Sequence, residues 1–327
     1  MAKVLVTGGA GYIGSHTVWV LRQRGHEVAV VDDLSRGHEH NVRGPGFHLL
    51  TLADTEALTR MMAAEHFEAV IHFAAYIAVG ESTQKPELYF TNNVSGSLSL
   101  FTAMERTGVK RIVFSSTAAV YGEPAGVPIA EDQPYAPVSP YGASKVMIEQ
   151  VLDWLDRYKN VRSVCLRYFN ACGAAPEAGL GEEHDPETHL IPLLIRAVQT
   201  GKPITIFGDD YPTPDGTCIR DYIHVLDLAE AHVRALEHLL QGGGSEKFNV
   251  GTGSGHSVRE VMQAVDAVSG QKVPHVIGAR RAGDPPALVA DSRKLQRRLN
   301  WTPRHTDLQE IVRTAWEFAN QPAGVRP

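Results

Sequence analysis

Cysteine is scarce in this chain of 327 residues, which contains only Cys165, Cys172 and Cys218. No two of them form a C-x-x-C pair, and an odd count provides no disulfide framework, so free thiols in a reducing compartment are expected. No run of about 18 apolar residues is present, so no membrane-spanning helix is predicted. The N-terminal MAKVLVTGGAGYIG lacks the apolar core and cleavage site of a signal peptide. These absences predict a cytoplasmic protein without membrane association.

A surplus of positive charge is also missing. The formal net charge is −6, and no basic patch or stripe occurs, which argues against nucleic acid as a partner. The 15 histidines are scattered without an H-E-x-x-H motif or a Cys/His cluster, so no metal site is predicted. What the chain does have is 43% hydrophobic residues, enough for one large domain or two closely joined ones.

Segments typical of buried strands alternate with helical segments through the first half of the chain, which predicts an α/β fold with a doubly wound, parallel Rossmann sheet. After about residue 170 the loops become longer and richer in proline and glycine, which indicates a smaller mixed α/β lobe for the substrate. We expect domains at 1–170 and 171–327, with some late segments returning to the first. The strands are expected at 3–7, 27–31, 69–73, 110–114 and 162–167, the helices between them at 12–24, 54–65, 92–107 and 143–158, and the short strands of the second lobe at 203–207, 246–250 and 273–277.

Gly8, Gly11 and Gly14 stand between the first expected strand and the first expected helix. Glycines at this junction let the backbone approach a pyrophosphate closely, and the helix N-terminus supplies N–H groups and a positive dipole. Asp32 ends the second strand, where a carboxylate can accept both hydroxyls of the adenosine ribose, and Asp33 is a second acid beside it. This pattern favours NAD as the cofactor.

Tyr141 and Lys145 are four residues apart in SPYGASK, so on a helix they share one face. An ammonium beside a phenol favours the phenolate, so we expect the tyrosine pKa to fall below its reference value of about 10. Such a tyrosine can take a proton from a sugar hydroxyl. Ser115 and Thr117 follow the strand at 110–114, and ligands of α/β proteins bind where strands end.

These features resemble the short-chain dehydrogenase/reductase family in its extended branch. Rarer stretches along nearly the whole chain are similar to UDP-glucose 4-epimerases. They are TGGAGYIGSH (7–16), HFAAYIAVGES (72–82), NNVSG (92–96), FSSTAAVYG (114–122), SPYGASK (139–145), LRYFNACGA (166–174), FGDDYPTPDGTCIRDYIHV (207–225) and RRAGDPPALVADS (280–292).

The resemblance implies tightly bound NAD, a UDP-sugar substrate, and reversible 4-epimerisation of UDP-glucose and UDP-galactose through a transient 4-keto sugar. It implies that Tyr141 removes the proton of the 4-hydroxyl, supported by Lys145, and that Thr117 bonds the reacting oxygen. The residues implied at the cofactor are Gly8, Gly11, Tyr12, Ile13, Gly14, Asp32, Asp33, Phe73, Ala74, Ala75, Asn92, Ser115, Tyr141, Lys145 and Tyr168. Those implied at the substrate are Thr117, Asn170, His189, Leu190, Phe207, Arg220, Arg281, Asp284 and Leu288.

Several substrate residues have a more specific implied role. Arg220 and Arg281 resemble the arginines at the phosphates, a role that suits a forked guanidinium. Taken alone, Arg220 would instead be interpreted as a salt-bridge partner of Asp221 or Asp227. Leu288 stands where members restricted to glucose and galactose have tyrosine, which leads to the hypothesis that UDP-GlcNAc and UDP-GalNAc are also accepted.

Three other functions fit part of the pattern. A nucleotide-sugar dehydratase would need an acid and a base after Thr117, where this chain has Ala118 and Ala119. An epimerase for another UDP-sugar stays open. A non-catalytic NAD sensor is disfavoured because Thr117, Tyr141 and Lys145 are all retained. The helices at 92–107 and 143–158 carry small and apolar residues on faces not needed by the sheet, and in the family such helices pair in a homodimer.

Overall fold

The computed structural model describes residues 1–42, 44–281 and 284–321. Contacts divide the chain into two compact units. Unit 1 contains residues 1–122, 134–167 and 229–248, and unit 2 contains residues 123–133, 168–228 and 249–327. The chain passes briefly into unit 2 at residues 123–133, leaves unit 1 again between Arg167 and Tyr168, and returns to it for residues 229–248.

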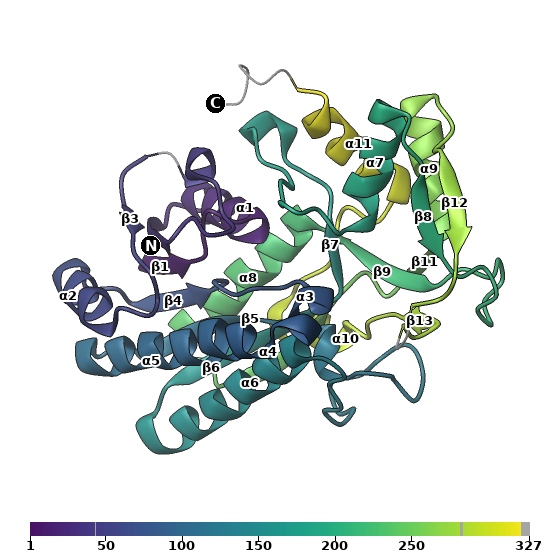
Figure 1. Ribbon diagram of the computed structural model, residues 1–327. Coiled ribbons are helices and arrows are strands. Elements are labelled where there is room, and N and C mark those ends of the chain that lie inside the picture. Colours follow the sequence, from purple (N-terminus) through teal and green to yellow (C-terminus); the bar gives the residue numbers. More distant parts are fainter. Residues whose placement is uncertain (43, 282–283, 322–327) are drawn as a thin grey trace. The chain divides into compact units, whose positions relative to one another are not determined.

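A seven-stranded sheet forms the centre of unit 1, in the order β10-β6-β5-β4-β1-β2-β3. Figure 1 labels its strands β1, β3, β4, β5 and β6. Its pairs β2–β3, β1–β2, β1–β4 and β4–β5 are parallel. The chain moves outward from β1 to β3 and then returns to the other side of β1, which makes a topological switch point between β1 and β4. The strands are β1 (Lys3–Thr7), β2 (Glu27–Asp32), β3 (Phe47–Leu49), β4 (Ala69–His72), β5 (Arg111–Thr117), β6 (Arg162–Tyr168) and β10 (Glu246–Val250).

Helices cover this sheet because the strands are apolar on both faces and need two buried surfaces. The core includes Leu5, Val70 and Ile112 from strands and Leu100 and Leu152 from helices. The helical elements of this unit are α1 (Tyr12–Gln23), η1 (Glu39–Val42), α2 (Thr55–Glu65), α3 (Val79–Gln84), α4 (Pro86–Tyr89), the π-helical η2 (Phe90–Ser95), α5 (Gly96–Thr107), η3 (Ala118–Val120), α6 (Pro140–Lys159) and most of α8 (Val225–Leu240).

Unit 2 is built on small sheets with helices packed against them. Strand β9 pairs with β11, β13 and β7, and β8 pairs with β12. Apolar faces of α7, α9 and α11 meet around Leu194, Val265 and Ile311. The elements are β7 (Asn170–Cys172), η4 (Pro176–Ala178), α7 (Leu190–Thr200), β8 (Ile204–Phe207), β9 (Ile219–His224), β11 (Gly255–Ser257), α9 (Val258–Ser269), β12 (His275–Gly278), β13 (Ala287–Leu288), α10 (Arg293–Leu299) and α11 (Leu308–Ala319).

The predicted α/β class and Rossmann sheet are confirmed, with one strand placed differently. Residues 246–250 were expected among the short strands of the second lobe, but β10 joins the large sheet beside β6. Buried Phe248 explains this, because its side chain needs an apolar surface on that sheet. No helix among the described residues has both the length and the apolar character needed to cross a membrane.

Candidate active site

The turn between β1 and α1 brings the backbone of three glycines very close together. Gly8 has φ +72°, and a Cβ there would lie 2.5 Å from the Ala74 nitrogen. A Cβ on Gly14 would overlap the Gly8 carbonyl oxygen, so the first helical turn can only pack on the loop without a side chain. Gly11 is the N-cap of α1 and has no side-chain hydrogen bond to the helix N-terminus. The turn therefore offers backbone N–H groups and the positive end of a helix, as a pyrophosphate requires.

Asp32 lies at the end of β2 beside this turn. Its carboxylate accepts hydrogen bonds from the Ala10 and Leu34 nitrogens, both at 2.9 Å. Burial raises the pKa of Asp32, while those two amides oppose the rise. The exposed Asp33 accepts the Ser35 amide at 2.9 Å and so caps a local turn. Asp32 is the buried acid of the pair, and its oxygens retain lone pairs for ribose hydroxyls.

The other residues expected at the cofactor lie at strand ends or in the segments that follow them. The amides of Phe73 and Ala74 both donate to the Thr7 carbonyl, at 2.9 and 3.2 Å, which fixes the end of β4 against β1. Tyr12, Ile13 and Gly14 form the first turn of α1. Ala75 and Asn92 are half-buried on segments after β4 and in η2, and Tyr168 ends β6.

Sequence analysis missed the role of Asn93, the neighbour of Asn92. The buried Asn93 side chain accepts the Tyr76 amide at 2.8 Å and donates to the Tyr76 carbonyl at 3.0 Å. It also donates to Ser144 Oγ at 3.1 Å, which ties the segment after β4 to α6. The motif NNVSG contained this residue, but its letters do not show which asparagine points inward.

The three predicted catalytic residues come together where β5 ends against α6. Ser139 caps α6 and Pro140 occupies its first turn, so the helix begins three residues before the expected position. Tyr141 is buried and hydrogen-bonded to the Thr117 side chain. Lys145 Nζ donates to the Ser115 carbonyl at 2.9 Å and lies 5.9 Å from the centre of the Tyr141 ring.

The expected depression of the Tyr141 pKa is not found. Burial raises the pKa of Tyr141 to about 12, and the hydrogen bond from Thr117 opposes this rise. Burial also lowers the pKa of Lys145 to about 7, against the attraction of Glu149. The argument from the i, i+4 spacing was wrong on this point because it counted the neighbouring ammonium and omitted desolvation, which acts on both groups.

A buried ion pair behind these residues was also missed. Glu149, one turn beyond Lys145, accepts hydrogen bonds from Ser116 Oγ at 2.5 Å and from Tyr135 at 2.7 Å. Arg167 of β6 donates to the same carboxylate at 2.7 Å through its Nη2 and at 3.0 Å through its Nε. Burial would raise the pKa of Glu149, but its bonds to Arg167 and the two hydroxyls lower it. The spacing of Lys145 and Glu149 on one helix face was visible in the sequence, whereas the partners from β5 and β6 were not.

In unit 2, several expected substrate residues lie on one face of the small sheet around β9. Arg220 of β9 pairs in register with Leu288 of β13, and Tyr222 pairs with Asn170 of β7. Positions 220 and 222 are two residues apart, so they and their parallel partners project to the same side. Arg220 Nη2 also lies 3.2 Å from Asp284 Oδ1. The interpretation of Arg220 as a partner of Asp221 or Asp227 is therefore wrong, since it pairs with Asp284.

A second pair of expected residues stacks near β8. The guanidinium of Arg281 lies 4.0 Å from the centre of the Phe207 ring, and that ring remains 37% exposed. A half-exposed aromatic ring backed by a cation offers a flat surface to a planar base. Leu190 instead packs against the core of unit 2.

His189 caps the N-terminus of α7 within a compact set of acids and histidines. Its Nδ1 lies 2.7 Å from Glu182 Oε1 and 3.1 Å from Glu187 Oε1. Burial alone would lower the pKa of His189, but these carboxylates raise it to about 10. The pKa of Glu182 falls to about 2, because bonds to His184 and His189 outweigh burial. His189 was expected at the substrate, but its acidic partners were not predicted, although the spacing E-x-H-x-x-E-x-H was a usable signal.

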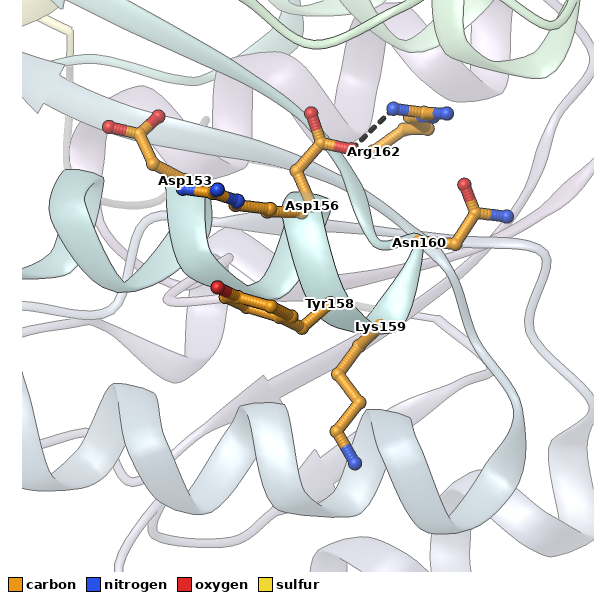
Figure 2. Close-up of a pocket in the computed structure, with 7 residues that line it drawn as sticks. Asp153, Asp156, Tyr158, Lys159, Asn160 and Arg162 are labelled. Carbon is orange, nitrogen blue, oxygen red and sulfur yellow. Dashed lines mark hydrogen bonds and ion pairs between the residues drawn. The ribbon is translucent and has the colours of Figure 1, made fainter.

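A shallow surface hollow lies at the other end of α6 and is lined by polar side chains, with Asp156 and Arg162 forming an ion pair there (Figure 2). Tyr158 on its wall is 17 residues beyond Tyr141, a distance of roughly 25 Å along a helix. This hollow is therefore separate from the hydroxyl and lysine cluster at the start of α6.

Comparisons with known proteins agree with these observations. Residues 4–251 match the family model described as the NAD dependent epimerase/dehydratase family. The UDP-glucose 4-epimerase of Azospirillum brasilense is 50% identical over 321 residues, covering 96% of this chain and 92% of that protein. The crystal structure of UDP-glucose 4-epimerase from Brucella ovis in complex with NAD superposes with a TM-score of 0.94 at 46% identity, covering 97% of this chain and 98% of that one. The UDP-Glc/GlcNAc 4-epimerase from Campylobacter jejuni has a TM-score of 0.85 at 40% identity, covering 97% and 99%.

The pKa of Lys145 leads to a prediction about stability. Between pH 7 and 9 the unfolded chain keeps the lysine proton, whereas the folded protein loses it near pH 7, so stability should rise with pH. We expect this group to contribute an increase of about 2 kcal/mol in the free energy of unfolding. Urea unfolding of the wild type and of Lys145→Met at both pH values measures it. Equal pH dependence in the two proteins would contradict the prediction.

Proposed function

The chain belongs to the NAD dependent epimerase/dehydratase family and, within it, to the UDP-glucose 4-epimerases. From this we propose that it interconverts UDP-glucose and UDP-galactose by inverting carbon 4 of the sugar. The single observation that carries the proposal is the convergence of Thr117, Tyr141 and Lys145 at the end of β5. These three groups can act in general acid–base catalysis on a sugar hydroxyl. They lie in the unit that also contains the glycine turn and Asp32.

The cofactor is NAD, and the residues of unit 1 fit it. The open N-terminus of α1 and the close packing at Gly8 and Gly14 leave room for a pyrophosphate against the backbone. Asp32 offers its carboxylate to the ribose. When bound, NAD supplies the acceptor and donor of the hydride at carbon 4 of the sugar.

The chain's own residues handle the proton. We assign Tyr141 as the base that takes the proton of the 4-hydroxyl and later returns it. Because burial raises the pKa of Tyr141 to about 12, its phenolate needs a nearby positive charge, and a protonated Lys145 provides one. Thr117, already bonded to Tyr141, is placed to bond the same sugar oxygen. Ser115 positions Lys145 through its carbonyl oxygen.

We assign the UDP part of the substrate to unit 2. Arg220 and Asn170 share one sheet face with Leu288, and the Arg220 guanidinium suits a diphosphate. Asp284 is assigned to the uridine ribose and Phe207 with Arg281 to the uracil and phosphates. The Nδ1 atom of His189 is engaged by carboxylates, so the ring presents Nε2 to a ligand. If the protein binds the UDP part firmly and makes few fixed contacts with the sugar, the 4-keto sugar can rotate and present its opposite face.

A dehydratase reaction is not supported by the residues after Thr117. Ala118 and Ala119 form the start of η3, where a dehydratase would need an acid and a base. The methyl groups of these alanines cannot donate or accept protons, so these two residues cannot catalyse the elimination of water.

The proposed reaction is tested by incubating purified protein with UDP-galactose and no added cofactor, and separating the products by chromatography. We expect UDP-glucose from the wild type. Tyr141→Phe, which removes only one hydroxyl, should lower kcat by about 10²–10⁴-fold. If no UDP-glucose forms even with added NAD, the proposed function is wrong; full activity in Tyr141→Phe would refute the assignment of the base.

Leu288 leads to a prediction about the sugar. It pairs with Arg220 in the small sheet, and its side chain is smaller than the tyrosine of restricted members. We expect the wild type to convert UDP-GlcNAc, as the name of the UDP-Glc/GlcNAc 4-epimerase from Campylobacter jejuni indicates for that relative. Leu288→Tyr should lower kcat/KM for UDP-GlcNAc by roughly tenfold to a hundredfold while UDP-galactose turnover is kept. If the wild type shows no turnover of UDP-GlcNAc, the hypothesis that N-acetylated UDP-sugars are accepted is wrong.

We also propose a homodimer formed through α5 and α6, which run side by side (Figure 1). Met147, Trp154 and Tyr158 are 43%, 57% and 66% exposed and lie along one face of α6, and Leu98 of α5 is 44% exposed. Exposed apolar side chains grouped in this way mark an interaction surface.

Light scattering at micromolar concentration should give twice the chain mass of 35.6 kDa. Trp154→Glu should shift it toward a single chain, and Leu49→Glu, at a 64% exposed apolar residue of β3, is the matched control. A wild-type mass of one chain would contradict the dimer.

We further propose a cytoplasmic location, which the three free cysteines support, because isolated thiols persist in reducing compartments. Fractionation of the native cells should recover the protein with a cytosolic marker. Recovery in an oxidising compartment would contradict this.

A further inference from the structure

Four side chains just before α7 surround one point. Glu182, His184, Glu187 and His189 each offer one ligand atom, and all four atoms lie within 4.8 Å of one another. Both histidines point Nδ1 at the carboxylates: that of His184 lies 3.0 Å from Glu182 Oε1 and 4.0 Å from Glu187 Oε2. Nδ1 of His189 lies 2.7 Å from Glu182 Oε1 and 3.1 Å from the other oxygen of Glu187, Oε1. The two rings face the same pair of acids, with centroids 5.1 Å apart.

We propose that these four residues bind a zinc ion. Zinc in structural sites has four ligands in a tetrahedron, with bonds of about 2.0–2.2 Å to nitrogen and oxygen. Such bonds place neighbouring ligand atoms roughly 3.4 Å apart. The two distances to Glu182 Oε1, 2.7 and 3.0 Å, are shorter than that value. Those to Glu187, 3.1 Å from His189 to Oε1 and 4.0 Å from His184 to Oε2, lie on either side of it. Small side-chain shifts therefore convert this set into a tetrahedral site. This proposal replaces the expectation of a metal-free chain.

The two carboxylates of the cluster lie where a cation can balance them. The side chains of Glu182 and Glu187 are only 6% and 2% exposed. Within the described residues, both acids form ion pairs with His184 and His189. The Thr188 and His189 amides also donate to Glu187. A zinc ion on two neutral histidines balances both carboxylates.

The ligand types point to the same metal. Imidazole nitrogen combined with carboxylate oxygen suits zinc, whereas calcium and magnesium prefer oxygen ligands alone. All four ligands come from residues 182–189. A metal bound to them would therefore link this segment to His189, the residue directly before α7. Four protein ligands make a structural rather than a catalytic zinc site.

A metal at this point would also orient His189. Coordination through Nδ1 leaves the proton on Nε2, and the side chain is 37% exposed, so the ring would present a fixed donor outward. The zinc site itself does not depend on the proposed function, because its binding requires neither the cofactor nor a UDP-sugar.

The test measures zinc in the untagged full-length protein by elemental analysis after exposure to Zn²⁺ and removal of loose metal by gel filtration. We expect one zinc per chain. Glu187→Gln and His184→Asn should each lose most of it, and His275→Asn, which changes an exposed histidine of β12, should keep it. No zinc retained by the wild type, or equal zinc in all four proteins, would overturn the proposal and leave the cluster as a protonated one.

A second measurement needs no variant and so does not depend on the folding of Glu187→Gln or His184→Asn. X-ray absorption of the zinc-loaded wild type should show two imidazole nitrogens and two oxygens at about 2.0–2.2 Å. A spectrum of a fully hydrated ion or one with sulfur ligands would place the metal elsewhere and overturn the proposal. Zinc should also raise the melting temperature of the wild type, and chelator should reverse that rise.

Discussion

The carboxylate of Glu149 is the constraint on which the predicted chemistry of unit 1 depends. It is fully buried on α6 and accepts hydrogen bonds from Ser116 of β5 and from Arg167 of β6. Breaking such a pair leaves an uncompensated buried charge, which typically costs 3–5 kcal/mol. Glu149 thereby holds α6 against the two strands, and Lys145 and Tyr141, one and two turns earlier on the same helix, reach Ser115 and Thr117 at the end of β5.

Burial of these groups opposes the charged forms that the proposed reaction uses. Desolvation raises the pKa of Tyr141 to about 12 and lowers that of Lys145 to about 7, and so acts against both the phenolate and the ammonium. Glu149 acts against this by favouring the charged lysine. A charged Lys145 beside the Tyr141 ring would in turn favour the phenolate.

The sequence was sufficient for features that depend on local spacing. Gly8, Gly11 and Gly14 between a strand and a helix, with Asp32 at the next strand end, predicted the Rossmann sheet and its ligand edge, because these features follow from chain order. Features that depend on distant partners were not predictable. Glu149 pairs with Arg167 of β6, and Arg220 pairs with Asp284. Strand β10 joins the first sheet although segments of unit 2 precede it in the sequence. The Tyr141 pKa was predicted in the wrong direction for a related reason, since burial is a property of the folded chain.

The central claim is that carbon 4 loses and regains a hydride while Tyr141 exchanges only the hydroxyl proton. Its most direct test is conversion of UDP-galactose carrying deuterium at carbon 4, followed by NMR or mass spectrometry of the UDP-glucose formed. The account predicts that the product keeps the deuterium at carbon 4 and that none appears in water. Loss of the label to solvent would mean that the carbon itself is deprotonated, and would contradict the proposed roles of Tyr141, Lys145 and the cofactor.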